Sequence, residues 1–265
     1  MQLIDNSAPH LCLWQLSKTY GPLMSLQLGT VPTLVVSSAK MAKEIMKTHD
    51  LTFSSRPTSY GPQKLSYNAS DVVFSPYNDS WREKRKICTL NLFSHKRVQS
   101  FRPIREDEVC RMIKKISEQA SSSKLTNLSE IVMSLACSII CRVAFGKSYD
   151  DEGYESSRFH GLFYEVQAVA SSFFISDYFP LFGWVDKLTG LHARLEKIFK
   201  QTDIFYQELI NDHLGPNRAK SVEEDVIDIL LQLKKDQLSS IHLSFDDIKA
   251  VIMVIINIVV SNLCF

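Results

Sequence analysis

The chain has 265 residues, 45% of them hydrophobic and 22% charged, so it can bury a sizeable core and does not have the composition of a disordered protein. Its formal net charge of +1 argues against a nucleic-acid-binding protein, because such domains are usually strongly basic. The six cysteines include no C-x-x-C pair and are thinly spread, so we assign neither a disulfide framework nor a metal site.

The first predicted element is a β-hairpin at about residues 20–37. Residues 24–28 alternate apolar and polar side chains, and residues 33–36 are rich in β-branched side chains. The Gly-Thr-Val-Pro segment between them, residues 29–32, is typical of a turn. Ser38 then caps the first predicted helix.

Residues 51–80 lose this periodicity and fill with Ser, Pro, Gly, Asn and Asp, and a loop of this length in a compact domain is usually functional. The rest of the chain is predicted to be almost entirely helical. One helix follows a capping box that begins at Asn127, a second ends at Gly215-Pro216, and a final apolar helix begins at Ser244. The sequence therefore predicts a mainly α fold with a small N-terminal β-sheet.

No segment of the sequence is predicted to span a membrane. The start of the chain is too polar for a signal peptide, and the longest apolar run, residues 250–260, is broken by Asn257. That run is also shorter than the roughly 20 residues that a membrane-spanning helix needs.

The most informative pair of side chains is Trp81 and Arg85, in the segment Tyr-Asn-Asp-Ser-Trp-Arg-Glu-Lys-Arg-Lys at residues 77–86. On a helix the two residues lie about 40° apart around the axis, so both side chains project from one face. An indole N–H beside a guanidinium suits a carboxylate, because Arg can donate two parallel hydrogen bonds. On spacing alone a surface cation–π pair is the better explanation, so other motifs have to decide.

Three further motifs surround this pair. Tyr-Gly-Pro at residues 20–22 precedes the hairpin, Phe-Ser-Ser-Arg-Pro at residues 53–57 follows the first helix, and Val-Phe-Ser-Pro-Tyr at residues 73–77 leads into Trp81. This succession, together with W-x-x-x-R, resembles the microsomal cytochrome P450 family of plants from about Asn6 to Met253. The resemblance implies that residues 1–265 are the N-terminal part of a P450 catalytic domain, truncated at both ends, with a partial P450 fold.

The resemblance implies a haem cofactor, with one propionate held by Trp81 and Arg85. It also implies that residues 59–74 form the first substrate-recognition loop, leading over the haem, and that a second recognition region begins near residue 169. The candidate pocket residues are Val72, Val73, Phe74, Val169 and Phe173. A plain packing role remains an open alternative for each of them.

Basic side chains occupy the same helix and continue beyond it. They are Arg82, Lys84, Lys86, Lys96 and Arg97. A charge run of this kind is usually a solvated face. The resemblance implies instead that this surface docks an acidic NADPH-cytochrome P450 reductase, which suits electrostatic steering of a transient partner.

The family places its haem-ligating cysteine in a Phe-x-x-Gly-x-Arg-x-Cys-x-Gly loop, and no segment of this chain matches it. Cys264 is followed only by Phe265, with no Gly or Arg around it. The family's oxygen-activation motif, an acid followed by Thr, has no counterpart in residues 254–262. We therefore assign no catalytic residue and expect the chain alone to be inactive.

By resemblance, the function is a haem-dependent monooxygenation of a small, mostly apolar plant metabolite, with O₂ and electrons derived from NADPH. The full-length relative is expected on the cytosolic face of the endoplasmic reticulum membrane. The alternative is a non-catalytic helical fragment or a partner-binding protein.

Overall fold

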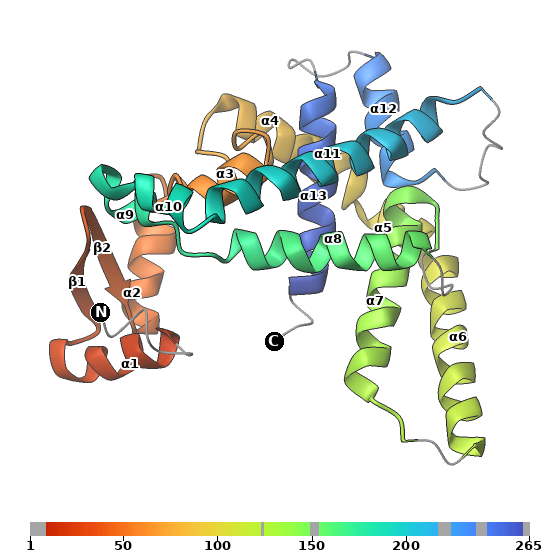
Figure 1. Cartoon of the computed structure of the whole chain (residues 1–265), viewed down its shortest axis with the longest axis horizontal. Coiled ribbons are helices and arrows are strands. Elements are labelled where there is room, and N and C mark those ends of the chain that lie inside the picture. Colours follow the sequence, from red (N-terminus) through yellow and green to blue (C-terminus); the bar gives the residue numbers. More distant parts are fainter. Residues whose placement is uncertain (1–8, 123–124, 149–153, 217–223, 237–242, 262–265) are drawn as a thin grey trace.

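The computed structural model describes residues 9–122, 125–148, 154–216, 224–236 and 243–261. Figure 1 shows a mainly helical molecule with one small sheet near the beginning of the chain. The predicted fold class, mainly α with a small N-terminal β-sheet, is confirmed.

The sheet is an antiparallel hairpin of β1 (Leu23–Leu28) and β2 (Val31–Val36), as predicted. The strand ends pair in register, so the two-residue turn falls at Gly29 and Thr30. Gly29 has a φ of +60°, and an added Cβ would lie 2.2 Å from the carbonyl oxygen of Tyr178. The Thr30 amide donates to that same oxygen at 2.8 Å, which docks the hairpin against a segment far along the chain.

The remaining elements are helical, and several of them are short. The α-helices are α1 (Pro9–Tyr20), α2 (Ala39–Lys43), α3 (Tyr60–Leu65), α4 (Asp79–Ile87), α5 (His95–Ser100), α6 (Arg102–Ser121), α7 (Leu128–Phe145), α8 (Tyr154–Ala170), α9 (Ile175–Tyr178), α10 (Trp184–Leu188), α11 (Leu191–Leu214), α12 (Val226–Asp236) and α13 (Phe245–Ser261). Short helical turns extend α2 over Glu44–Thr48 and α4 over Cys88–Leu92, and another spans Pro180–Phe182. The expected irregular loop at residues 51–80 therefore contains one short helix, α3, and the first two residues of α4.

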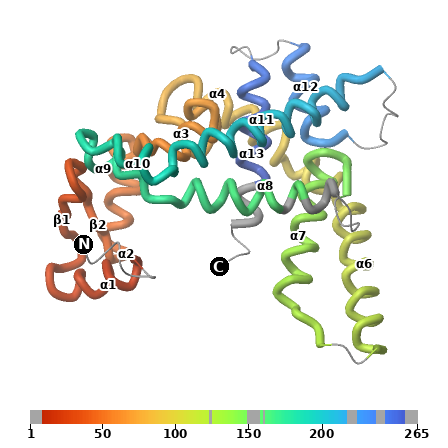
Figure 2. Tube along the Cα trace, viewed as in Figure 1, coloured from red at the N-terminus to blue at the C-terminus, as the bar shows by residue number. Residues whose placement is uncertain are grey.

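Helices α8 and α11 lie side by side across the molecule, and α13 packs against both of them (Figures 1 and 2). Helices α6 and α7 form an antiparallel pair that projects away from the rest. The main hydrophobic core joins α7, α11, α12 and α13. Its fully buried side chains include Cys141, Phe145, Leu209, Ile210, Ile227, Ile248 and Ile252. A second core cluster joins α3, the end of α8 and the start of α11, through Leu65, Val166, Val169, Phe174, Leu195 and Ile198.

Capping hydrogen bonds lie at the predicted starts of α7 and α13. The Asn127 side chain accepts from the Glu130 amide, and Gly146 closes α7 with a φ of +66°. Ser244 and Asp247 bond to each other's backbone amides at the start of α13, at 3.0 and 2.9 Å. These reciprocal bonds satisfy amides that a helix start leaves without an intrahelical acceptor.

By length and composition, one helix among the described residues, α7, could cross a membrane. The expectation that no segment spans a membrane stays a prediction. Residues 128–145 are mostly apolar but include Ser, Glu and Arg side chains, so they do not form an unbroken apolar run. Length and composition alone are weak indicators, because a core helix passes the same test, and α7 packs against α6, α12 and α13.

Candidate functional site

Trp81 and Arg85 lie together on one face of α4, as their spacing predicts. The Asn78 side chain caps the helix by accepting from the Trp81 amide at 2.8 Å. The indole of Trp81 is half-buried, and the exposed guanidinium of Arg85 lies over it with Cζ 5.2 Å from the ring centroid. This is cation–π geometry, the alternative that the spacing left open.

The donors of the two side chains are not equally available. The indole N–H of Trp81 donates to the carbonyl oxygen of Val72 at 3.0 Å. The guanidinium of Arg85 forms no hydrogen bond or ion pair with any residue that the structure describes. A stacked guanidinium keeps its N–H groups directed outward in its own plane, so Arg85 can still receive a carboxylate. Trp81 can join it only by exchanging its bond to Val72.

The loop before α4 has three consecutive residues of positive φ and a buried aspartate. Tyr67, Asn68 and Ala69 all have positive φ, at 54°, 60° and 56°. Residues other than glycine avoid this region, at a cost of order 1–3 kcal/mol each. Asp71 is fully buried; its Oδ1 accepts from the amides of Val73 and Phe74, while its Oδ2 has no partner among the described residues. The amides of Asn68 and Ala69 donate to the Gln63 carbonyl at 2.9 and 3.3 Å, so local backbone bonds support this turn together with tertiary contacts.

Two buried lysines supply such contacts. The ammonium of Lys84 donates to the Ser70 carbonyl at 2.8 Å and pairs with Oδ1 of Asp247 at 2.6 Å. Lys249, on α13, pairs at 2.6 Å with Asp203, which also accepts from the Tyr67 hydroxyl at 2.9 Å. Burial alone would raise the pKa of the Asp247 carboxyl, but hydrogen bonds from Lys84 and Ser244 outweigh it and lower that pKa.

Burial, with the Asp203 carboxylate as a second cause, raises the pKa of Tyr67 far above its ordinary value. The Tyr67 hydroxyl therefore stays protonated and remains a donor to Asp203. The left-handed turn is thus linked to α11 and, through Lys249, to α13.

The candidate docking residues divide into two groups. Arg82, Lys86 and Lys96 are exposed, and Arg97 is half-buried with its guanidinium 3.2 Å from Glu224. Lys84 is different: it is only 6% exposed and both of its contacts are internal. The expectation that Lys84 presents its charge to a partner is corrected, because Asp247 draws its ammonium into the interior.

The candidate pocket residues do not lie in one place. Val72 and Val73 are half-buried and pack against the main core, and Phe74 is also half-buried. Val169 is fully buried in the second core cluster, where it packs with α3 and α11. Phe173 is 44% exposed, and its ring stacks on Tyr178 with centroids 4.8 Å apart. A role in a pocket remains a prediction for all five.

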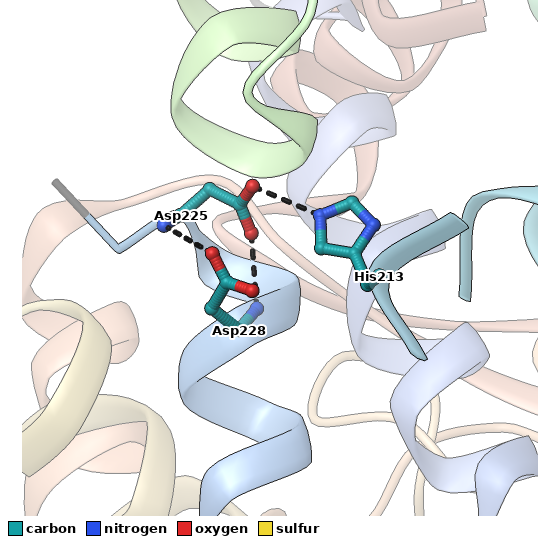
Figure 3. Close-up of side chains that lie close together, drawn as sticks. All are labelled: His213, Asp225 and Asp228. Carbon is teal, nitrogen blue, oxygen red and sulfur yellow. Dashed lines mark hydrogen bonds and ion pairs between the residues drawn. The ribbon is translucent and has the colours of Figure 1, made fainter. Parts of the chain in front are cut away.

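Sequence reasoning missed one cluster at the junction of α11 and α12. Figure 3 shows His213, Asp225 and Asp228, whose potential metal-ligand atoms lie within 4.8 Å of one another. The Nδ1 of His213 lies 2.6 Å from the Leu209 carbonyl, and its Nε2 lies 2.9 Å from Asp225. The carboxylates of Asp225 and Asp228 accept from each other's backbone amides at 2.9 and 3.3 Å.

These bonds describe a helix junction. The His213 imidazole has an oxygen beside each of its nitrogens, so it links the end of α11 to the cap of α12. The Asp-x-x-Asp pattern is a visible capping signal in the sequence, but nothing local indicates that a histidine from the preceding helix joins it.

Comparison with known proteins identifies relatives across almost the whole chain. The family model described as "Cytochrome P450" matches residues 1–257. A protein of Pastinaca sativa named "6,7,8-trihydroxycoumarin synthase" is 52% identical over 257 residues, which cover 97% of this chain and 50% of the relative. A "5-OH-xanthotoxin synthase" of Ammi majus is 51% identical over 257 residues, with the same coverage.

The fold has solved counterparts as well. A zebrafish cytochrome P450 solved with progesterone superposes with a TM-score of 0.73 at 22% sequence identity. The match covers 94% of this chain and 55% of the zebrafish chain. This chain thus spans about half the length of the curated relatives that it matches.

Proposed function

This chain belongs to the cytochrome P450 family of plants, and from this we propose that Trp81 and Arg85 hold one propionate of a haem cofactor. The observation that supports the proposal is the exposed guanidinium of Arg85, which has no acceptor among the described residues and lies on the indole of Trp81. A propionate fits Arg85 directly. It fits Trp81 if the indole N–H leaves the Val72 carbonyl for the carboxylate.

Haem, when bound in a complete P450, would supply the activation of oxygen. The residues of this chain would contribute binding and orientation: Arg85 would neutralise a propionate, and Trp81 would fix its direction. The 265 residues contain no match to the Phe-x-x-Gly-x-Arg-x-Cys-x-Gly loop. We therefore infer that the complete protein is a monooxygenase and that these residues alone do not perform the reaction.

Haem binding can be tested without activity. In a Trp14→Phe/Trp184→Phe background Trp81 is the only tryptophan, so its fluorescence reports a bound porphyrin. In a titration followed by fluorescence quenching, Arg85→Gln should bind haemin about tenfold more weakly than the parent, because a charge-assisted hydrogen bond is lost. Arg82→Gln is the matched control, since that guanidinium is exposed and bonds to Tyr77. Equal affinity of the two variants would contradict the assignment.

For the complete protein we propose hydroxylation of the ring of a coumarin-type aromatic compound. The proposal is supported by the names of the two plant relatives, which describe a hydroxylated coumarin and a hydroxylated xanthotoxin as products. Microsomes with the complete protein and a reductase should convert coumarins to products one oxygen heavier. Conversion of an unrelated terpene instead of any coumarin would overturn the proposed substrate class.

Members of this family generally use a reductase partner, and relatives of this plant type are generally membrane-associated. More specifically, we propose that Arg82, Lys86, Lys96 and Arg97 dock an acidic NADPH-cytochrome P450 reductase, and that the complete protein sits on the cytosolic face of the endoplasmic reticulum. Electrostatic steering predicts that Lys86→Glu/Lys96→Glu slows reduction of the complete protein most at low salt. Unchanged reduction kinetics would count against this surface.

A second candidate is a non-catalytic helical fragment. It is favoured by large apolar side chains at the surface, such as Leu128 at 61% and Leu181 at 89% exposure. The reduced carbon monoxide difference spectrum separates the two candidates, because only a haem-thiolate centre gives the characteristic Soret band.

A further inference from the structure

Lys84 is buried in a helix whose other cations face solvent. Its residue is 6% exposed, whereas the side chain of Lys86, two positions later, is 63% exposed and has only a loose partner, Glu83, at 3.9 Å. A buried ammonium is strongly unfavourable unless it is paired and hydrogen-bonded. Asp247 provides the pair at 2.6 Å, and the Ser70 carbonyl provides a further acceptor at 2.8 Å.

The same helix makes a second bond to the same loop. Trp81 lies one turn before Lys84 and donates to the Val72 carbonyl at 3.0 Å. The two acceptors, Ser70 and Val72, are alternate residues, so α4 holds alternate carbonyls of one short segment. The residue between them, Asp71, turns its carboxylate forward to the amides of Val73 and Phe74.

These contacts connect three segments that are distant in the sequence. Lys84 joins the loop to α4, and its ion pair with Asp247 joins both to the first turn of α13. The preceding left-handed residues, Tyr67 to Ala69, cannot hold this position by backbone preference, because each sits in a region that L-residues avoid. Backbone bonds from Asn68 and Ala69 to Gln63 tie the loop to the end of α3. Side-chain anchors tie it to the other elements, and Lys84 is the anchor that reaches two other segments at once.

We propose that Lys84 is a positioning residue. With Trp81 it fixes the proposed recognition loop, residues 59–74, against α4, and so places Val72, Val73 and Phe74 beside Trp81 and Arg85. The proposal deepens the proposed function and rests on it for the role of this loop. Lys84 acts through the loop and does not itself touch substrate or haem. Its test uses no haem, so failure of the test would leave the propionate assignment untouched.

The experiment separates positioning from stability with two variants. Lys84→Met keeps the apolar stem but leaves the Asp247 carboxylate buried without its partner. Lys84→Met/Asp247→Asn also removes that charge, which should restore the stability of the fold, yet the Ser70 carbonyl still lacks its donor. Lys86→Met is the matched control on the exposed face of the same helix. All variants are made in the Trp14→Phe/Trp184→Phe background.

Two local readouts follow the loop. Amide hydrogen exchange of residues 70–74 should rise about tenfold in the double variant while amides of α11 keep the parent rate, because one charge-assisted hydrogen bond is lost locally. The emission of Trp81 should shift and become more easily quenched, because the Val72 carbonyl no longer stays in place. Lys86→Met should change neither readout.

The proposal is overturned if loop exchange in the double variant stays within about twofold of the parent. It is also overturned if exchange in α11 rises by the same factor, because Lys84 would then act only on global stability. If Lys84→Met alone fails to fold, the double variant still decides the question.

Discussion

The indole N–H of Trp81 donates to the carbonyl oxygen of Val72, so α4, which carries Trp81 and Arg85, is bonded to the proposed recognition loop. The bond spans nine residues and crosses from the loop to the first turn of α4. A carboxylate and the Val72 carbonyl therefore compete for one donor. Binding of a carboxylate by Trp81 and Arg85 is therefore coupled to the position of the loop through the indole N–H of Trp81.

Removing this bond should have a measurable cost. Trp81→Phe leaves the Val72 carbonyl without its donor, and we expect the free energy of unfolding to fall by about 1–2 kcal/mol. Urea unfolding followed by circular dichroism measures it. Trp184→Phe is the control, since Trp184 is 57% exposed, and it should change stability by less than about 0.5 kcal/mol. An equal effect of both substitutions would show that the bond contributes nothing.

The ion pair of Lys84 and Asp247 predicts a specific dependence on pH. The pKa of Asp247 is lowered below its ordinary value of 3.8 in the folded protein, so its contribution is complete above that value and is lost as the pH falls through the folded pKa. At pH 6 we expect Asp247→Asn to be less stable than the parent by about 3 kcal/mol, because Lys84 is left buried without a counter-charge.

Below about pH 4 this difference should shrink, since the unfolded parent then binds a proton at Asp247 that the folded parent binds only at lower pH. Urea unfolding of the parent and the variant at pH 6, 4 and 3 measures it. A difference that stays constant over this range would mean that Asp247 does not stabilise the fold through its charge.

Gly61 and Gly161 make a matched pair of substitutions. An added Cβ at Gly61 would lie 2.7 Å from Cε2 of Phe174, so Gly61→Ala should overpack the second core cluster and destabilise the protein by about 1–3 kcal/mol. At Gly161, within α8, nothing lies within 4 Å, and Gly161→Ala should stabilise by about 0.5–1 kcal/mol through helix propensity. Thermal unfolding of both variants should give shifts of opposite sign; shifts of the same sign would contradict the packing around α3.

The cluster of His213, Asp225 and Asp228 is predicted to act as a helix junction and not to retain zinc. The Nε2 of His213 is already bonded to Asp225, so a metal ion would have to break that bond. Calorimetric titration with Zn²⁺ should show no saturable binding that His213→Gln abolishes. Asp225→Asn should lower the free energy of unfolding by about 1–2 kcal/mol, because a buried charge-assisted bond and a helix cap weaken together.

The chain with added haemin is expected to give no thiolate-type band in the reduced carbon monoxide difference spectrum. Burial raises the pKa of the Cys88 thiol to about 11, so this cysteine near α4 stays protonated at neutral pH and is a poor iron ligand. A weak non-thiolate haem signal would agree with the prediction. A thiolate-type Soret band would show that another cysteine of this chain can replace the family's ligand loop.

The elements that the sequence predicts well are those with local signals. The hairpin follows from alternation and a Gly-containing turn, and the starts of α7 and α13 follow from caps within four residues. The spacing of Trp81 and Arg85 likewise defines their shared face without any tertiary information.

The expectations that failed depend on distant partners. Five consecutive charged residues, 82–86, give α4 no apolar stripe, so nothing local indicates which lysine turns inward. Lys84 turns inward because it pairs with Asp247, which belongs to another helix, α13. In the same way, His213 pairs with Asp225 only because α11 and α12 meet, and a window of neighbouring residues contains no sign of that meeting.

The turn at Thr30 donates both its amide and its hydroxyl to the carbonyl of Tyr178, which lies 148 residues later. During synthesis at about 5–20 residues per second, the hairpin therefore emerges about 7 to 30 seconds before its acceptor exists. Over that interval the amino-terminal strands have only each other, and an isolated two-stranded hairpin is marginally stable. The hairpin can therefore make its contact with Tyr178 only after α9 has left the ribosome.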